Sequence, residues 1–130
     1  MLVIMVDWST DEPVYGQIAR QIRARIASGE LPAGSLLPSV RSVASDLGVN
    51  LNTVARAYRI LEEERFVVIR DRAGATVAPP ARDADGAIIE SLSEELSVVL
   101  ARRRQAGLRS VELRRRIGGE LASLRERGEK

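Results

Sequence analysis

The side chains best suited to bind another molecule gather between Ser39 and Arg56, at the starts of two predicted helices. They carry hydroxyl, amide and guanidinium groups and are Ser39, Arg41, Asn50, Asn52, Thr53 and Arg56, with Leu51 exposed among them. Asparagine can form two hydrogen bonds with adenine, threonine can donate to a phosphate or touch a thymine methyl group, and arginine can bind phosphate or guanine. The same residue types also favour ordinary helix starts. Taken alone, they leave DNA recognition and simple helix capping open.

The elements that must carry these side chains read as two short helices joined by a tight turn. The first helix has an inward apolar stripe at Val40, Val43, Ala44 and Leu47, and the second has one at Val54, Ala57, Tyr58 and Leu61. Ser39 and Asn50 can cap the two helices, and Gly48 can supply the positive φ of the turn. This spacing is typical of a helix-turn-helix, whose second helix presents its N-terminal residues to the DNA major groove. The capped helix starts would add phosphate-binding amides, and Arg41 would reach the backbone or a nearby base.

The surrounding sequence predicts a mainly α module with a small β-hairpin wing over residues 1–80. An edge strand is expected at MLVIMV, then a helix capped by Thr10 or Asp11 that runs to about Ser28 and stops at Gly29. Residues 66–69 and 75–78 read as the hairpin, with Arg70, Arg72 and Gly74 at its tip. Trp8 and Tyr58 are expected to pack in the core or at its edge.

From Glu12 to Val77 the chain resembles the GntR family of bacterial transcription regulators. The matching residues include Pro13-Val14-Tyr15, Gln17, Gly29, Gly34, Leu37-Pro38-Ser39, Arg41, Thr53-Val54, Ala57-Tyr58 and Leu61. The resemblance implies a dimeric, operator-binding regulator whose C-terminal part dimerises and can sense a small-molecule effector. The short segment after Pro80 is similar to the YtrA subfamily, whose members often sit beside genes for ABC transporters.

The wing departs from the family pattern at four positions. Arg65 stands where the family usually has glycine before the first wing strand, and Arg72, Ala75 and Thr76 replace residues of the usual tip. Two interpretations follow. Either Arg70 and Arg72 grip a phosphate or the minor groove, which we favour, or the wing is loosened and contributes less.

The segment 81–130 predicts a two-helix hairpin, with helices near residues 85–105 and 110–127. Apolar residues at spacings of three and four form seams suited to a second copy of the chain. The expected dimerisation residues are Ile89, Leu92, Leu96, Val99, Ile117 and Leu121. The arginine runs 102–104 and 114–116 can be solvated faces, which is the usual case, or partners of acidic residues in the second copy, or anion ligands.

The amino-acid composition excludes several classes of catalytic and metal site. The 130 residues include no cysteine and no histidine, and Lys130 is the only lysine, so catalytic triads, cysteine or imidazole metal sites and a Schiff-base lysine are excluded. We therefore expect no enzyme, no cofactor and no metal. Without cysteines or a plausible signal or membrane segment, we expect a cytoplasmic location.

The charge balance of residues 1–80 limits where DNA could bind, and two other functions are compatible with the sequence. Within residues 1–80 nine arginines offset nine acidic residues, so any basic surface must be local. Two other functions remain open: a winged-helix protein–protein adaptor that binds no operator, and, remotely, a small hydrolase. Consecutive Glu62, Glu63 and Glu64 point in different directions on a helix and are expected to form a solvated helix end, not a metal or catalytic site.

Overall fold

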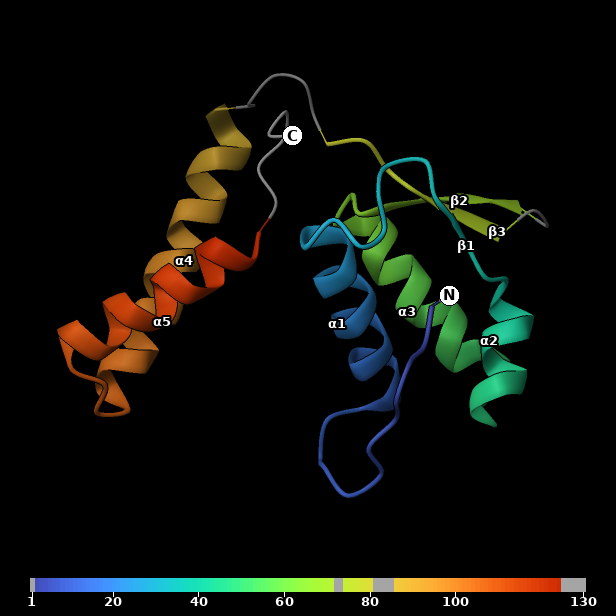
Figure 1. Cartoon of the computed structure of the whole chain (residues 1–130), viewed down its shortest axis with the longest axis horizontal. Coiled ribbons are helices and arrows are strands. Elements are labelled where there is room, and N and C mark those ends of the chain that lie inside the picture. The colour runs from blue at the N-terminus through green and yellow to red at the C-terminus, as the bar shows by residue number, and fades with distance from the viewer. Residues whose placement is uncertain (1, 72–73, 81–85, 125–130) are drawn as a thin grey trace. The chain divides into compact units, whose positions relative to one another are not determined.

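The computed structural model describes residues 2–71, 74–80 and 86–124, and in these ranges it has five helices and three strands. The chain forms two compact units, Met1–Pro80 and Ala81–Lys130. The first contains α1 (Val14–Ala27), α2 (Val40–Leu47) and α3 (Leu51–Glu63), with strands β1 (Leu36–Leu37), β2 (Val67–Arg70) and β3 (Gly74–Val77) (Figure 1). The predicted class, mainly α with a small β wing, is confirmed.

The two helices of the helix-turn-helix begin and end where the sequence predicts. The Ser39 side chain accepts a hydrogen bond from the Ser42 N–H at the start of α2 (3.1 Å), and the Asn50 side chain accepts one from the Asn52 N–H at the start of α3 (2.8 Å). Gly48 ends α2 with φ 67°, and the Val49 N–H donates to the Ala44 carbonyl. Since such a cap is worth about 1 kcal/mol, these two starts are well defined.

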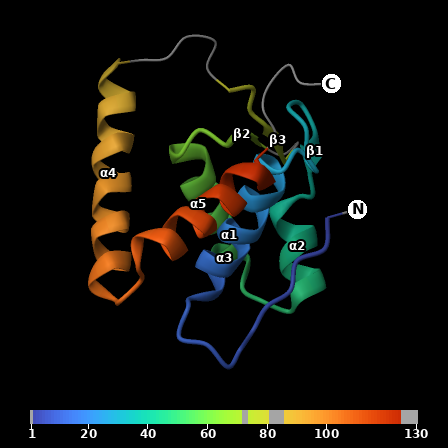
Figure 2. The ribbon, with the colours of Figure 1, turned by 60° about the vertical axis from the view of Figure 1, so that its left-hand side comes forward.

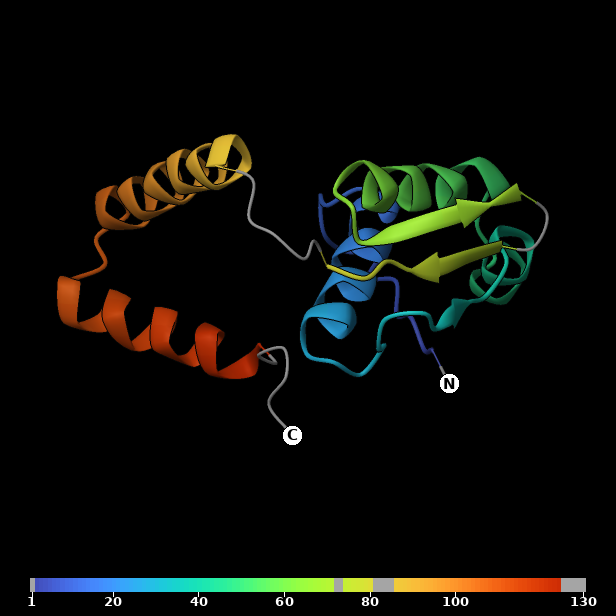
Figure 3. The same ribbon diagram turned by 90° about the horizontal axis from the view of Figure 1, so that it is seen from above.

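The wing sheet has one strand more than the sequence predicts. Its order is β1-β3-β2, with every pair antiparallel, and the two-residue β1 pairs Leu36 with Thr76 and Leu37 with Ala75. The β2 and β3 strands form the expected hairpin, with Val67 opposite Val77 and Arg70 opposite Gly74 (Figure 3). A two-residue strand is too short to show alternation, which is why the sequence pattern missed it.

The core of the first unit lies between the three helices and one face of the sheet. Buried residues come from every element of the unit, and the most deeply buried ones include Ile18, Ile22, Leu37, Val54, Leu61, Val67 and Ala75. The predicted stripe of α3 is confirmed, because Val54, Ala57, Tyr58 and Leu61 are all buried. The core therefore fixes α3 by one face and leaves the opposite face in solvent.

The predicted edge strand at the N-terminus is wrong. Residues 2–7 have no strand partner, and the edge position beside β3 belongs to β1. Their backbone is held by side chains of α1 instead: Gln21 bonds both the N–H and the carbonyl of Met5, and Gln17 does the same for Asp7. Ile4 still packs into the core, which explains the apolar sequence.

Two further expectations at this end are corrected. Neither Thr10 nor Asp11 caps α1, which begins at Val14 after Pro13; the Thr10 hydroxyl accepts from the Glu12 N–H in a turn before the helix. Trp8 is not packed, since it is 70% exposed. The Asp7 carboxylate accepts hydrogen bonds from both the N–H and the hydroxyl of Ser9, and this tight turn leaves the intervening Trp8 in solvent.

The second unit contains two helices, α4 (Gly86–Gln105) and α5 (Ser110–Ser123), close to the predicted ranges. Gly107, with φ 100°, makes the turn between them, which Figure 2 shows. Residues 125–127 of the predicted second helix lie outside the described residues. No residue of either helix is buried within the described part of the chain. None of the described helices combines the length and apolar character needed to cross a membrane.

Candidate nucleic-acid interface

The N-terminus of α2 is braced from α3. The Tyr58 hydroxyl donates a hydrogen bond of 2.6 Å to the Pro38 carbonyl, one residue before the Ser39 cap. Burial raises the pKa of Tyr58 to about 12, so the phenol remains a hydrogen-bond donor to a higher pH than an exposed tyrosine would. This contact holds the amide-bearing start of α2 against α3. Arg41, in the first turn of α2, is exposed beside it.

The N-terminus of α3 projects outward with the residue types that the sequence predicted. Leu51 is 44% exposed, Asn52 is exposed, and Thr53 is half-buried. The Asn50 side chain caps the helix, so it fixes the backbone here. Leu51 and Asn52 are both accessible to a macromolecule at this end.

Two arginines continue the outer face of α3. The Arg56 guanidinium carbon lies 3.9 Å from the centroid of the Tyr15 ring, a face-on contact with α1. Arg59, also exposed, lies one turn further and was missed by the sequence prediction. The signal was available, since Asn52, Arg56 and Arg59 follow the spacing i, i+4, i+7 of one helical face.

The wing begins with a backbone conformation that suits glycine. Arg65 has φ 66°, so it adopts the conformation of the glycine that usually stands there, and the hairpin forms with arginine in its place. The Glu62 carboxylate of α3 accepts a hydrogen bond of 2.8 Å from the Ile69 N–H of β2. Glu62 is exposed, as the sequence predicts for a solvated helix end, and its side chain also ties the wing to α3.

Of the three residues predicted at the wing tip, the structure describes Arg70 and Gly74. Arg70 is exposed at the end of β2, and Gly74 begins β3 with φ 91°. An added Cβ would make only an ordinary contact with the Leu37 carbonyl, at 3.5 Å, so the left-handed φ and not a lack of space selects glycine at position 74. Arg72 lies outside the described residues.

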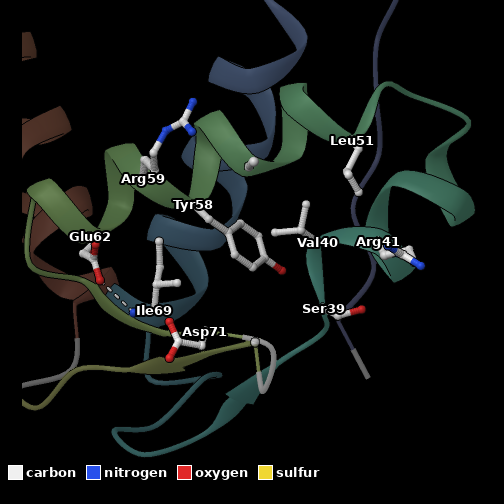
Figure 4. Close-up of a pocket in the computed structure, with 11 residues that line it drawn as sticks. Ser39, Val40, Arg41, Leu51, Tyr58, Arg59, Glu62, Ile69 and Asp71 are labelled. Atoms are coloured by element: carbon white, nitrogen blue, oxygen red, sulfur yellow. Dashed lines mark hydrogen bonds between the residues drawn. The ribbon is translucent and has the colours of Figure 1, made fainter.

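These elements enclose a groove of about 980 Å³ between the start of α2, the face of α3 and the wing (Figure 4). Four predicted site residues line it: Ser39, Arg41, Leu51 and Gly74. Arg59 and Asp71 line it as well, so the groove has basic and acidic groups. Asn50, Asn52, Thr53, Arg56 and Arg70 are not part of its lining, and Arg56 turns toward α1 instead.

Carboxylates in the described part of the chain do not gather into a metal site. Among residues 2–71, 74–80 and 86–124, no group of three or more acidic side chains lies close enough to hold a metal ion. Beside the carboxylates of Glu62 and Asp71, the groove carries hydroxyl and guanidinium groups and backbone amides at helix starts. Such groups bind phosphate and base edges.

The family model described as bacterial regulatory proteins of the gntR family matches residues 14–77, the segment that contains every element of this groove. The chain is 41% identical over 75 residues to the HTH-type transcriptional regulator Rv1152 of Mycobacterium tuberculosis. This alignment covers 58% of this chain and 62% of that protein. It is 37% identical over 65 residues to the HTH-type transcriptional repressor YtrA of Bacillus subtilis, covering half of each chain. The alignments therefore span 50–62% of the length of these two relatives, which is less than two thirds.

A solved structure extends the likeness beyond the DNA-binding unit. YtrA from Sulfolobus acidocaldarius, a GntR-family transcription factor, is 36% identical with a TM-score of 0.65, and the match covers 80% of this chain and 99% of that one. These relatives are transcription regulators and not enzymes, in agreement with the sequence prediction. The chain belongs to the GntR family of DNA-binding transcription regulators and is similar to its YtrA members.

Proposed function

We propose that the chain is a repressor that binds a palindromic operator as a homodimer. The observation that carries the proposal is the outward start of α3, capped by Asn50 and flanked by the start of α2 and the wing. In a helix-turn-helix this is the part that enters the major groove. Repression is supported by the likeness to the Bacillus protein, which is named a repressor.

We assign each predicted contact residue a role from the chemistry of its side chain. Leu51, Asn52 and Thr53 meet base edges, because they stand at the tip of the recognition helix. Phosphates are bound by Arg41, Arg70 and the amide N–H groups behind the caps of Ser39 and Asn50, with Arg59 added by its place in the groove. Arg56 binds a phosphate or a guanine edge. Arg72 and Gly74 remain predicted contacts of the wing.

The C-terminal unit, residues 81–130, is the part that we expect to pair two copies of the chain. Its seam is open to solvent in the single chain: Ile89 is 49% exposed, Leu92 57%, Leu96 56%, Val99 48% and Leu121 62%, while Ile117 is half-buried. Apolar residues repeated along two helices are costly to leave in water, and a second copy would cover them. Two-fold symmetry then sets two recognition helices about 34 Å apart, or a multiple of that, along the DNA.

The test is fluorescence anisotropy with the DNA upstream of the gene and a scrambled duplex of equal composition, over a range of salt concentrations. Wild-type protein should prefer the upstream DNA, with affinity falling log-linearly with salt concentration. Arg41→Ala should weaken binding about tenfold, the size expected when one charged contact of 1–3 kcal/mol is lost. The matched control is Arg25→Ala, on α1, whose side chain lies beside Glu30 away from the groove.

Three outcomes are distinct. Weakening by Arg41→Ala but not by Arg25→Ala supports the docking. Equal weakening by both variants would mean that only net charge matters, and the docking would be wrong. Binding to neither duplex at any salt concentration would favour the protein–protein adaptor.

A further inference from the structure

We propose that Tyr15 is a positioning residue for DNA binding: its ring holds the guanidinium of Arg56 in the orientation in which Arg56 contacts the operator. The proposal rests on the docking of α3 proposed above and adds to it a residue of α1, a helix that lies beside α3 and outside the helix-turn-helix (Figure 1). Tyr15 would act only through Arg56.

The contact joins a fixed group to a mobile one. Tyr15 is half-buried in the first turn of α1 and packs against the core, so its ring has little freedom. Arg56 is exposed on α3, and its guanidinium carbon is 3.9 Å from the ring centroid. A long exposed arginine otherwise samples many rotamers, and immobilising it on binding has an entropic cost. If the side chain is already held by Tyr15 in the free protein, less conformational entropy is lost when DNA binds.

The geometry leaves the arginine able to bind. In a face-on stack the ring contacts the flat face of the guanidinium, while the five N–H donors point outward in its plane. Those donors can reach a phosphate or a guanine edge without breaking the stack. Within the described residues Arg56 forms no ion pair, so its charge is not already neutralised.

A second stacked arginine of the same unit shows the contrast. Arg23 lies over the Phe66 ring at 5.8 Å, but its guanidinium also pairs with Glu64 and ties α1 to the end of α3. That arginine is committed to the fold. Arg56 instead shares the outer face of α3 with Asn52 and Arg59, by the spacing i, i+4, i+7.

The test is a double-mutant cycle on affinity for the upstream duplex, with Tyr15→Leu, Arg56→Gln and the double variant. Tyr15→Leu alone should weaken binding about two- to fivefold, the factor that corresponds to an exposed cation–π contact. In the Arg56→Gln background it should have no further effect. Tyr15→Phe, which keeps the ring, should bind like wild type.

Arg56→Lys provides a variant that cannot disturb the core, because the residue is exposed. Lysine keeps the charge but loses the flat face, so we expect a loss similar to that of Tyr15→Leu and no additional loss when the two are combined. Unchanged affinity in Tyr15→Leu, a gain in affinity, or equal losses in both backgrounds would overturn the proposal. If wild type shows no preference for the duplex, or Arg41→Ala has no effect, the proposed function itself fails, which is a separate result.

Discussion

Arg65 shows how a single residue can meet a backbone demand that normally selects glycine. Its φ of 66° places it in the left-handed region between α3 and the wing, where a Cβ is sterically unfavourable. The Arg65 N–H donates to the Glu62 carbonyl and the Phe66 N–H to that of Leu61, so the end of the helix imposes the turn. The chain therefore tolerates local strain at the entry to the wing.

Replacing Arg65 with glycine should stabilise the protein. Relief of a left-handed conformation gains about 1–2 kcal/mol, and the greater freedom of glycine in the unfolded chain takes back about 0.5–1 kcal/mol, so we expect a net gain of about 0.5 kcal/mol. The control Arg65→Ala removes the same side chain but keeps the Cβ. Thermal unfolding should rank glycine above alanine. The reverse order would show that the conformation is not strained.

Tyr58→Phe should remove one hydrogen bond between α3 and the residue that precedes the α2 cap. Loss of the donor to the Pro38 carbonyl should reduce the free energy of unfolding by about 1 kcal/mol and weaken DNA binding through the start of α2. Urea unfolding and anisotropy measure the two effects. Unchanged stability and affinity would mean that the contact does not brace α2.

The same residue predicts a pH dependence. Burial raises the pKa of Tyr58 from 10.0 to about 12, so folding opposes its ionisation. Below pH 10 the phenol is protonated in both states and contributes no pH dependence, whereas stability should fall as the pH rises from 10 to 12. In a Tyr15→Phe background this loss should disappear when Tyr58 is also changed to phenylalanine. A fall of equal size in both proteins would assign it to other groups.

At the scale of elements, side chains of the helices hold the segments that flank them. Gln17 and Gln21 of α1 bond the N-terminal segment, Tyr58 of α3 bonds the residue before the α2 cap, and Glu62 bonds β2. The result is that α1 and α3 act as a frame for the more irregular parts. The start of α2 and the wing are both attached to α3, the proposed recognition helix.

The Glu62 contact can be isolated by hydrogen exchange. Glu62→Ala should lose protection of the Ile69 amide, because its acceptor is gone, while Glu62→Gln keeps an oxygen in place and should stay protected. Both variants remove the same charge, so a difference between them reports the hydrogen bond alone. Equal protection in both would mean that the strand pairing of β2 suffices to hold the wing.

The seam on α4 can be tested by the oligomeric state. Leu92→Glu with Leu96→Glu should convert the proposed dimer to a monomer, because two charges would be buried at an apolar contact. The control Ser91→Glu adds a charge one residue away from the seam, at an exposed position. Sedimentation should show a monomer only for the leucine variant. A dimer that survives both changes would place the interface elsewhere.

How much the sequence could predict differs between elements. Caps, helical stripes and the Gly48 turn are local signals, and the positions of α2 and α3 followed from them. The pairing of β1 with β3, the glutamine contacts of the N-terminal segment and the Tyr15–Arg56 stack join residues far apart in sequence, which periodicity does not report. Arg59 is the exception, because its helical spacing was visible, but its place in the groove depends on the wing.

At the scale of the whole molecule, the two units of the chain differ in what they bury. The first has a buried core and a polar outer face on α3, whereas the described residues of the second bury nothing. Net charge is only +2, so a general attraction to DNA is weak and the local arginines must act through their placement. Binding strength should therefore depend on sequence and on pairing of two copies, and not on charge alone.

The central claim, that a homodimer reads a palindrome, is tested most directly by selecting bound duplexes from a random-sequence library with the full chain and sequencing them. We predict an enriched motif with two inverted half-sites about one helical turn apart, or a multiple of that. The Leu92→Glu, Leu96→Glu protein should enrich it poorly. A single half-site enriched equally by both proteins, or no enrichment at all, would contradict the account.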